Sequence, residues 1–401
     1  MANAAVVVLR PGYERGRKQY TSAGEAMTGA TGEYSVSVTA GRYLLAAASM
    51  ASLRAGLQGA SAKPPGDEPE TTYTTVYYPR SPDETGAAPV DAAAGAELRG
   101  MDFYMTKVKA FRVSGKLAEP QPGKTTFVVL TPRTSTIAAA LAIKMVQVQP
   151  DGSFEFIGIT PGQWLLRAAG ETGGSASLQW LTVEDKHITG LVVTLAPLAD
   201  LPGAITVEGK DTVSPKGTQV TLDGVEAGKS GGQALAGEDG KFTVKSLMPD
   251  RYQVRISNAP ANVYLKSVRY GSQDVTDDGV DMTGGVRGSI EVLLNPNGAE
   301  IDGVVADDDG KPMPGVTVAL IPDSRRYRLF RSDTTDQTGA VRFQGVPPGD
   351  YKLLAWEDVV SGAWYDPEFL KPFEGKAEAV TVKENDRKSV ALKAVPKETK
   401  R

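Results

Sequence analysis

Residues 339–353 read Gly339-Ala340-Val341-Arg342-Phe343-Gln344-Gly345-Val346-Pro347-Pro348-Gly349-Asp350-Tyr351-Lys352-Leu353, so that apolar side chains alternate on both sides of a Pro-Gly corner. Alternation with a period of two indicates a half-buried strand. In a type II turn, proline presets φ at the second position and glycine supplies the positive φ that the third position requires. The pattern therefore predicts a β-hairpin whose two strands place aromatic side chains in a core.

The same pattern occurs three more times, beginning at Gly32, Gly152 and Gly240. The corners of these copies read Ala40-Gly41, Pro161-Gly162 and Pro249-Asp250. Aspartate can replace the corner glycine because it tolerates the left-handed region better than most residues. Successive copies start 88 to 120 residues apart, which is about the size of one seven-stranded β-sandwich. A unit repeated at this interval indicates several small domains in a row.

We therefore predict an all-β chain of four tandem Ig-like or transthyretin-like β-sandwich domains in an elongated array. The predicted domains are residues 1–108, 109–198, 199–296 and 297–401. Their predicted opening strands are 111–117, 203–207 and 301–306, and their predicted closing strands are 101–105, 191–195, 290–294 and 390–392. Short linkers are expected near residues 107–110, 197–203 and 295–299.

The first predicted domain is incomplete. Aligning Pro11 with Pro322 places Val7 on Val318, and the equivalent of the strand at 301–306 then falls before Met1. The sequence allows two interpretations. Either the sequence begins after the start of the natural chain, or a neighbouring subunit supplies the strand by β-strand addition.

Composition narrows the possible functions. The chain has 401 residues, no cysteine, one histidine and a formal net charge of −4. The absence of cysteine excludes disulfide frameworks, thiol catalysis and cysteine-bound zinc. Without a long basic run, nucleic acid is not an expected partner. No apolar stretch approaches the roughly 20 residues that span a bilayer, and residues 1–10 do not form a signal peptide.

The repeated hairpin resembles the carboxypeptidase regulatory-like domain, a transthyretin-like β-sandwich also similar to the collagen-adhesin B-type repeat. The best-matching copy carries Gly303, Asp307, Gly310 and Pro312, followed by Thr335-Asp336, Gly339 and the corner at 346–353. The resemblance implies a fold and a bacterial cell-surface or secreted protein whose domains are often classed with carbohydrate-binding folds. The peptidase that gives the family its name has no counterpart in this chain, so peptidase activity is not implied.

Residues that could carry catalysis or bind a metal are few. The single histidine, His187, cannot form a histidine-based zinc site alone, and we expect it in a loop before a strand. Asp307-Asp308-Asp309 and the run from Asp274 to Asp281 could offer oxygen ligands to calcium. Aspartate and glycine are also the residues that tight turns prefer, and we favour turns. We expect no catalytic residue, no metal site and no cofactor.

Aromatic residues outside the repeated hairpin are the better functional lead. Trp356, Trp364, Tyr365, Phe369 and Phe373 stand close together, and a second group, Tyr73, Tyr77 and Tyr78, precedes Pro79. Exposed aromatic faces stack on sugar rings and proline-rich peptides. The alternative is a loop that folds back and caps the sandwich. The candidate ligand-binding residues are Trp364, Tyr365 and Phe369.

These observations together predict a non-catalytic structural and binding module, a stalk or adhesin-like array, in an extracellular or periplasmic location. Its expected partners are a polysaccharide or a cell-surface protein. One alternative is a carbohydrate-binding protein that uses its loop aromatics. Another is an accessory fragment of a larger secreted enzyme or outer-membrane transporter.

Overall fold

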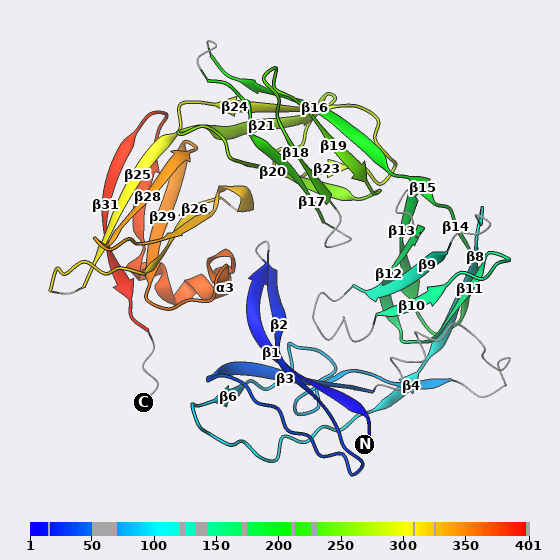
Figure 1. Cartoon of the computed structure of the whole chain (residues 1–401). Helices are drawn as coiled ribbons and strands as arrows, with labels where there is room; N and C mark the ends of the chain where they lie inside the picture. The colour runs from blue at the N-terminus through cyan, green and yellow to red at the C-terminus, as the bar shows by residue number, and fades with distance from the viewer. Residues whose placement is uncertain are drawn as a thin grey trace. The chain divides into compact units, whose positions relative to one another are not determined.

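The computed structural model describes residues 1–14, 17–49, 70–120, 125–133, 143–170, 175–209, 213–225, 231–307, 309–324 and 326–397. Nearly all of its regular structure is β-strand, so the predicted all-β sandwich class is confirmed (Figure 1). The chain forms two compact units, Met1–Gly12 with Gln19–Leu198 and Tyr13–Lys18 with Ala199–Arg401. The division into four domains with the boundaries given above stays a prediction.

The first unit begins with a single sheet in the order β2-β1-β3-β5, with β6 also paired to β3. Its strands are β1 (Ala4–Glu14), β2 (Arg17–Met27), β3 (Gly41–Ser49), β5 (Val76–Tyr77) and β6 (Val90–Ala92). We call this sheet, with the extended segments 33–39 and 101–105, the first sandwich. The segment 101–105, predicted as a closing strand, belongs to no sheet, which corrects that prediction. The predicted linker at 107–110 is also wrong, because β7 (Lys107–Lys109) pairs with β4 (Thr71–Tyr73).

The second sandwich packs a sheet in the order β10-β9-β12-β13-β15 against a smaller sheet, β11-β8-β14. Its strands are β8 (Phe111–Leu117), β9 (Thr126–Pro132), β10 (Lys144–Gln147), β11 (Ser153–Ile159), β12 (Gly162–Gly170), β13 (Ser175–Val183), β14 (Ile188–Val193) and β15 (Ala196–Pro197). Phe154, Phe156, Trp164 and Leu166 share its core, as their alternation predicts.

The second unit contains the third and fourth sandwiches. The third packs the sheet β19-β16-β24-β21-β22 against β18-β17-β20-β23. Its strands are β16 (Ala199–Val207), β17 (Gln219–Gly224), β18 (Gly231–Leu235), β19 (Lys241–Leu247), β20 (Arg251–Ser257), β21 (Tyr264–Tyr270), β22 (Gln273–Asp274), β23 (Val280–Asp281) and β24 (Ile290–Asn295). Residues 199–203 therefore belong to a strand and not to the predicted linker.

The fourth sandwich is one continuous sheet in the order β27-β26-β29-β31-β25-β28, with β30 also paired to β29. Its elements are β25 (Ala299–Ala306), β26 (Thr317–Pro322), η1 (Tyr327–Leu329), β27 (Arg331–Thr334), β28 (Ala340–Val346), β29 (Gly349–Trp356), η2 (Ala363–Tyr365), α3 (Pro367–Leu370), η3 (Lys371–Lys376), β30 (Glu378–Val382) and β31 (Arg387–Val395).

The hairpin corners differ from the predicted type II turns. Gly162 and Gly349 have positive φ, at 142° and 155°, but Gly41 and Asp250 do not. Asp250 is buried and its carboxylate accepts the Arg251 N–H instead. The glycines that begin the hairpins are in the left-handed region, such as Gly152 at φ 82° and Gly339 at φ 72°, and so are Gly158, Ser246 and Gly345 shortly before three of the corners. Each positive φ favours glycine because it has no Cβ.

A hydrogen bond explains which aromatic residue follows each corner. In all four copies this aromatic donates to the backbone carbonyl four residues earlier. The bonds run from Tyr43 to Thr39 over 2.6 Å, from Trp164 to Thr160 over 3.0 Å, from Tyr252 to Met248 over 2.7 Å and from Tyr351 to Pro347 over 2.9 Å. Tyrosine and tryptophan combine a large apolar ring with a polar tip. The position therefore requires a donor that phenylalanine lacks.

The alignment of Pro11 with Pro322 is wrong by one residue. Leu45 and Leu353 are equivalent, because each stands two residues after the aromatic residue of its corner. Leu353 pairs with Leu320, and Leu45 pairs with Val8. Val8 is therefore the counterpart of Leu320. Because side chains alternate, a slip of one residue exchanges the two faces of a strand, so Val7 lies on the outer face.

Candidate functional site

The aromatic segment of the fourth sandwich lies between β29 and β30 and folds into η2, α3 and η3. Gly362 enters it at φ 83°, a left-handed conformation. Asp366 then caps α3, because its carboxylate accepts the Glu368 N–H over 2.9 Å and Pro367 occupies the first helical position. These local signals turn the chain repeatedly and keep the segment compact.

The segment covers the outer face of β26 and β29. Ile321, Leu354 and Trp356 point away from the core of the fourth sandwich, and Trp364 packs on them. Trp364 is only 4% exposed and Trp356 only 2%. The rings of Trp356 and Phe373 meet edge to face at 5.8 Å between centroids, a favourable aromatic geometry. We call Trp356, Trp364, Tyr365, Phe369 and Phe373 the aromatic cap.

Two further aromatic residues, Tyr327 of η1 and Phe330 directly after it, contact Tyr365 of the cap. The ring of Phe330 lies 4.8 Å from that of Tyr365, and Tyr327 stacks on Phe330 at 6.0 Å with an interplanar angle of 23°. Tyr327 is 51% exposed. We call Tyr327, Phe330 and Tyr365 the aromatic patch. Sequence reasoning missed Tyr327 and Phe330 because they stand far from the cap in the sequence and outside the hairpin pattern.

The three predicted binding residues occupy different environments. Trp364 is buried, so its indole supports the cap from beneath and offers no face to a ligand. Tyr365 and Phe369 are half-buried at the surface of the cap. Burial raises the pKa of the Tyr365 hydroxyl, and nearby Arg255 opposes this shift. Tyr365 therefore keeps its proton at neutral pH and can both donate and accept a hydrogen bond.

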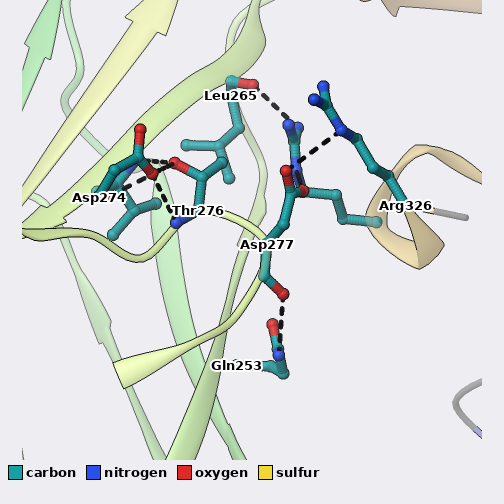
Figure 2. Close-up of polar contacts among 8 residues, drawn as sticks. Gln253, Leu265, Asp274, Thr276, Asp277 and Arg326 are labelled. Carbon is teal, nitrogen blue, oxygen red and sulfur yellow. Dashed lines mark hydrogen bonds and ion pairs between the residues drawn. The ribbon is translucent and has the colours of Figure 1, made fainter. Parts of the chain in front are cut away.

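Two arginines that flank Tyr327 hold η1 against the third sandwich, as Figure 2 shows around Asp277. The Nε of Arg328 lies 2.7 Å from Oδ1 of Asp277, and the Nε of Arg326 lies 3.2 Å from its Oδ2. Arg328 also donates to the Leu265 carbonyl over 3.3 Å, and Gln253 donates to the Asp277 carbonyl over 3.2 Å. This network fixes the loop that carries Tyr327.

The residues considered for metal binding have structural roles. His187 precedes β14 as predicted, and its Nδ1 accepts the Arg112 N–H over 2.9 Å. The carboxylate of Asp307 accepts the N–H groups of Asp309 and Lys311, which confirms a turn. Asp308 lies outside the described residues. Within the described ranges, no group of three His, Asp or Glu side chains could hold a metal ion.

Two other aspartates and Tyr77 of the first aromatic group also have structural roles. Asp274 and Asp281 each accept the N–H and hydroxyl of the threonine two residues later, as turn residues do. Tyr77 is 4% exposed and packs on the outer face of the first sheet.

Among the described residues, no helix is both long and apolar enough to cross a membrane.

Comparison with known proteins supports the fold of one part of the chain. Residues 300–392 match the model of the carboxypeptidase regulatory-like domain. No curated protein sequence gives a significant match. Several solved structures align, but at low similarity. The Bacillus anthracis TIE protein is 9% identical with a TM-score of 0.19, and the alignment covers 98% of this chain and 68% of that protein.

Two pilins align over less of the chain. The major pilin subunit of Bacillus cereus is 10% identical with a TM-score of 0.19, covering 71% of this chain and 98% of the pilin. The shaft pilin SpaA of Lactobacillus rhamnosus GG is 10% identical with a TM-score of 0.21, covering 49% and 97%. Scores this low carry no conclusion about function. The family match is confined to β25 to β31, and by it residues 300–392 are similar to the carboxypeptidase regulatory-like domain.

Proposed function

We propose that the chain is a non-catalytic structural and binding module, built of small β-sandwiches, of a cell-surface or secreted protein. The observation that carries this proposal is the use of the repeated residues. The corner aromatics Tyr43, Trp164, Tyr252 and Tyr351 are buried, and each gives its polar atom to a backbone carbonyl of its own corner. The repeated pattern thus serves shape and stability.

The junction between the third and fourth sandwiches also supports a structural role. Only Pro296, Asn297 and Gly298 separate β24 from β25. The Gly298 N–H donates to the Asn262 carbonyl over 2.8 Å, and the Asn295 amide donates to Glu384 of the fourth sandwich over 3.0 Å. Together with the ion pairs of Asp277, these bonds restrain the angle between the two sandwiches, as a spacer requires.

A distance measurement tests this role. Because the chain has no cysteine, Lys245→Cys and Glu378→Cys can carry a pair of spin labels on the third and fourth sandwiches. We expect a narrow distance distribution, which Asp277→Ala broadens because both arginines lose their ion pair with Asp277. Asp278→Ala removes an adjacent exposed carboxylate and is the matched control. A distribution that is already broad in the unsubstituted background would overturn the spacer proposal.

The aromatic patch favours a second candidate function, the binding of sugar rings or proline-rich segments. Tyr327 exposes half of its surface, and its ring contacts those of Phe330 and Tyr365. A rigid, half-exposed ring platform is suited to stacking on a pyranose or a proline. Polysaccharides and cell-surface proteins are therefore the partners to test.

Binding to a panel of soluble polysaccharides and proline-rich peptides separates the two candidates. The full chain with Tyr327→Ala is compared with Tyr104→Ala, which removes a tyrosine that is 56% exposed elsewhere. Saturable binding lost only in Tyr327→Ala would establish a ligand site. Binding that survives this change, or no binding to any probe, would leave the spacer function and refute the ligand site at the patch.

A further inference from the structure

Arg326 stands directly before the exposed ring of Tyr327, at the start of η1. Its Nε forms the ion pair with Asp277 at 3.2 Å, and its side chain is 56% exposed. Figure 2 shows the two terminal nitrogens of Arg326 pointing away from Asp277. The carboxylate therefore orients the guanidinium through one nitrogen, and the edge that carries the two terminal nitrogens is directed toward solvent.

Arg255 on β20 is held in the same way. Its Nε lies 3.0 Å from Oδ2 of Asp223, and its side chain is 67% exposed. Arg255 and Gln253 stand two positions apart on β20, so they share one face of the sheet. Gln253 donates to the carbonyl of Asp277, which places this face next to η1. The charge of Arg255 also acts on the hydroxyl of Tyr365 in the aromatic patch.

The charge beside the aromatic patch is positive. Asp277 is shared by the guanidinium groups of Arg326 and Arg328, so one positive charge is not neutralised by it. Arg331 donates to two backbone carbonyls, which carry no net charge. Burial raises the pKa of the Tyr351 hydroxyl, and the charges of all three arginines oppose this rise. An anion is therefore attracted to this side of the fourth sandwich.

The patch and its arginines offer two kinds of contact. The exposed ring of Tyr327 is a flat apolar surface on which a pyranose can stack. A guanidinium donates two parallel hydrogen bonds to the two oxygens of a carboxylate, a geometry that a lysine does not provide. A neutral sugar uses the ring alone. A sugar with a carboxylate on its pyranose, a hexuronate, can use both contacts.

We propose that the aromatic patch, together with Arg255 and Arg326, binds acidic polysaccharides whose pyranose units carry carboxylates. This inference rests on the second candidate function proposed above and assigns it a class of ligand. Tyr327 stacks on a sugar ring, and the two guanidinium groups bind carboxylates of the same polymer. The protonated hydroxyl of Tyr365 bonds a sugar hydroxyl.

A matched pair of ligands tests the class. A galacturonate oligosaccharide and its methyl ester share one backbone and differ in the charge of their carboxyl groups. We expect the full chain to bind the oligosaccharide saturably in isothermal titration calorimetry. The methyl ester should bind about tenfold more weakly or worse, as the loss of one charge-assisted hydrogen bond implies.

The possible failures of this test are distinguishable. Equal binding of the acid and its ester would refute the acidic ligand and leave the second candidate function in place. Binding of a neutral polysaccharide at Tyr327, with no binding of the galacturonate, would have the same consequence. If no saccharide binds, both the acidic ligand and the candidate function that it rests on are refuted.

Substitutions in the full chain locate the binding. Arg326→Gln and Arg255→Gln each remove one guanidinium at the patch, and each should weaken galacturonate binding about tenfold. Arg342→Gln is the matched control, because this side chain is 61% exposed and its Nε also pairs with an aspartate, Asp302, at 2.6 Å. Arg342 lies on β28, which contributes nothing to the cap or the patch. Its loss should leave binding unchanged.

All three arginines are more than half exposed, so the variants should fold, and circular dichroism checks this. Equal weakening in the three variants would indicate general attraction between charges and would overturn the site. Full binding in both patch variants would overturn it as well.

An acidic proline-rich peptide separates a polysaccharide from a protein partner. A peptide of repeated Glu-Pro units offers carboxylates and rings but no pyranose hydroxyl for Tyr365. We expect it to leave the oligosaccharide bound when the two are present at equal concentration. Displacement by the peptide that is lost in Tyr327→Ala would assign the patch to a protein partner and contradict the proposal.

Discussion

Removing the hydroxyl of Tyr351 tests how much one corner hydrogen bond contributes to the free energy of unfolding. The side chain is 2% exposed and donates to the Pro347 carbonyl over 2.9 Å. Tyr351→Phe keeps the ring and its packing, so the change removes only the hydrogen bond. Pro347 is half-buried, and water can partly replace the lost donor. We therefore expect the free energy of unfolding to fall by about 1 kcal/mol, within the usual net value of a hydrogen bond.

Native-state hydrogen exchange in low urea is the suitable assay because it reports each sandwich separately. The amides that join β26 to β29 should report the unfolding of the fourth sandwich. Their exchange should accelerate about fivefold, as a loss of about 1 kcal/mol implies. Amides that join β9 to β12 in the second sandwich should be unchanged.

The control is Tyr327→Phe, which removes a hydroxyl from a tyrosine that is 51% exposed. This change should leave exchange in the fourth sandwich unaltered, since water already solvates such a group. Equal exchange rates in the two variants would refute the reasoning, because the corner hydroxyl would then contribute nothing beyond the ring. A loss of several kcal/mol in Tyr351→Phe would also contradict it and would indicate a wider rearrangement.

Three further predictions follow from buried groups. Burial lowers the pKa of Lys144 from 10.5 to about 8. Between these values the unfolded chain binds the proton more readily, so the stability of the second sandwich rises with pH, and Lys144→Met should remove this rise in urea unfolding followed from pH 7 to pH 10.5. Gly203→Val should destabilise the third sandwich by about 1–3 kcal/mol in hydrogen exchange because its side chain overlaps Phe242. Trp364→Ala should cost about 3–5 kcal/mol in the fourth sandwich through the cavity it leaves, measured in the same way.

The parts of the fold that follow from a period of two were predictable from the sequence. The strand at Phe111–Leu117 and the cores built on Phe154 and Phe242 are found as expected. The corner bonds were not predictable, because the pattern records an aromatic residue and not the atom its polar tip reaches. Tyr327 was missed for a related reason: its place in the patch depends on how η1 packs on residues nearly forty positions later.

The register of β1 shows where periodicity fails. Ala4-Ala5-Val6-Val7-Val8-Leu9 is an uninterrupted apolar run, so alternation could not distinguish its two faces, and the alignment slipped by one residue. Such runs mark strands that are covered on both faces. In the first sandwich Tyr77 covers the outer face at Val7 and Leu9. The apolar run thus predicts a cover even where it cannot predict register.

The same reasoning changes how the aromatic cap is interpreted. The outer face of β29 presents Leu354 and Trp356, which are 3% and 2% exposed only because the cap lies over them. Leaving two such side chains in water would cost about 1.5–3 kcal/mol each. The cap is therefore required by the strand beneath it, and burial alone accounts for Trp364. Burial does not account for Tyr327. Its ring lies outside the cap that already covers β29, and half of its surface stays exposed to water. Stability explains the inner aromatics, and a role in binding must be sought in the outer ones.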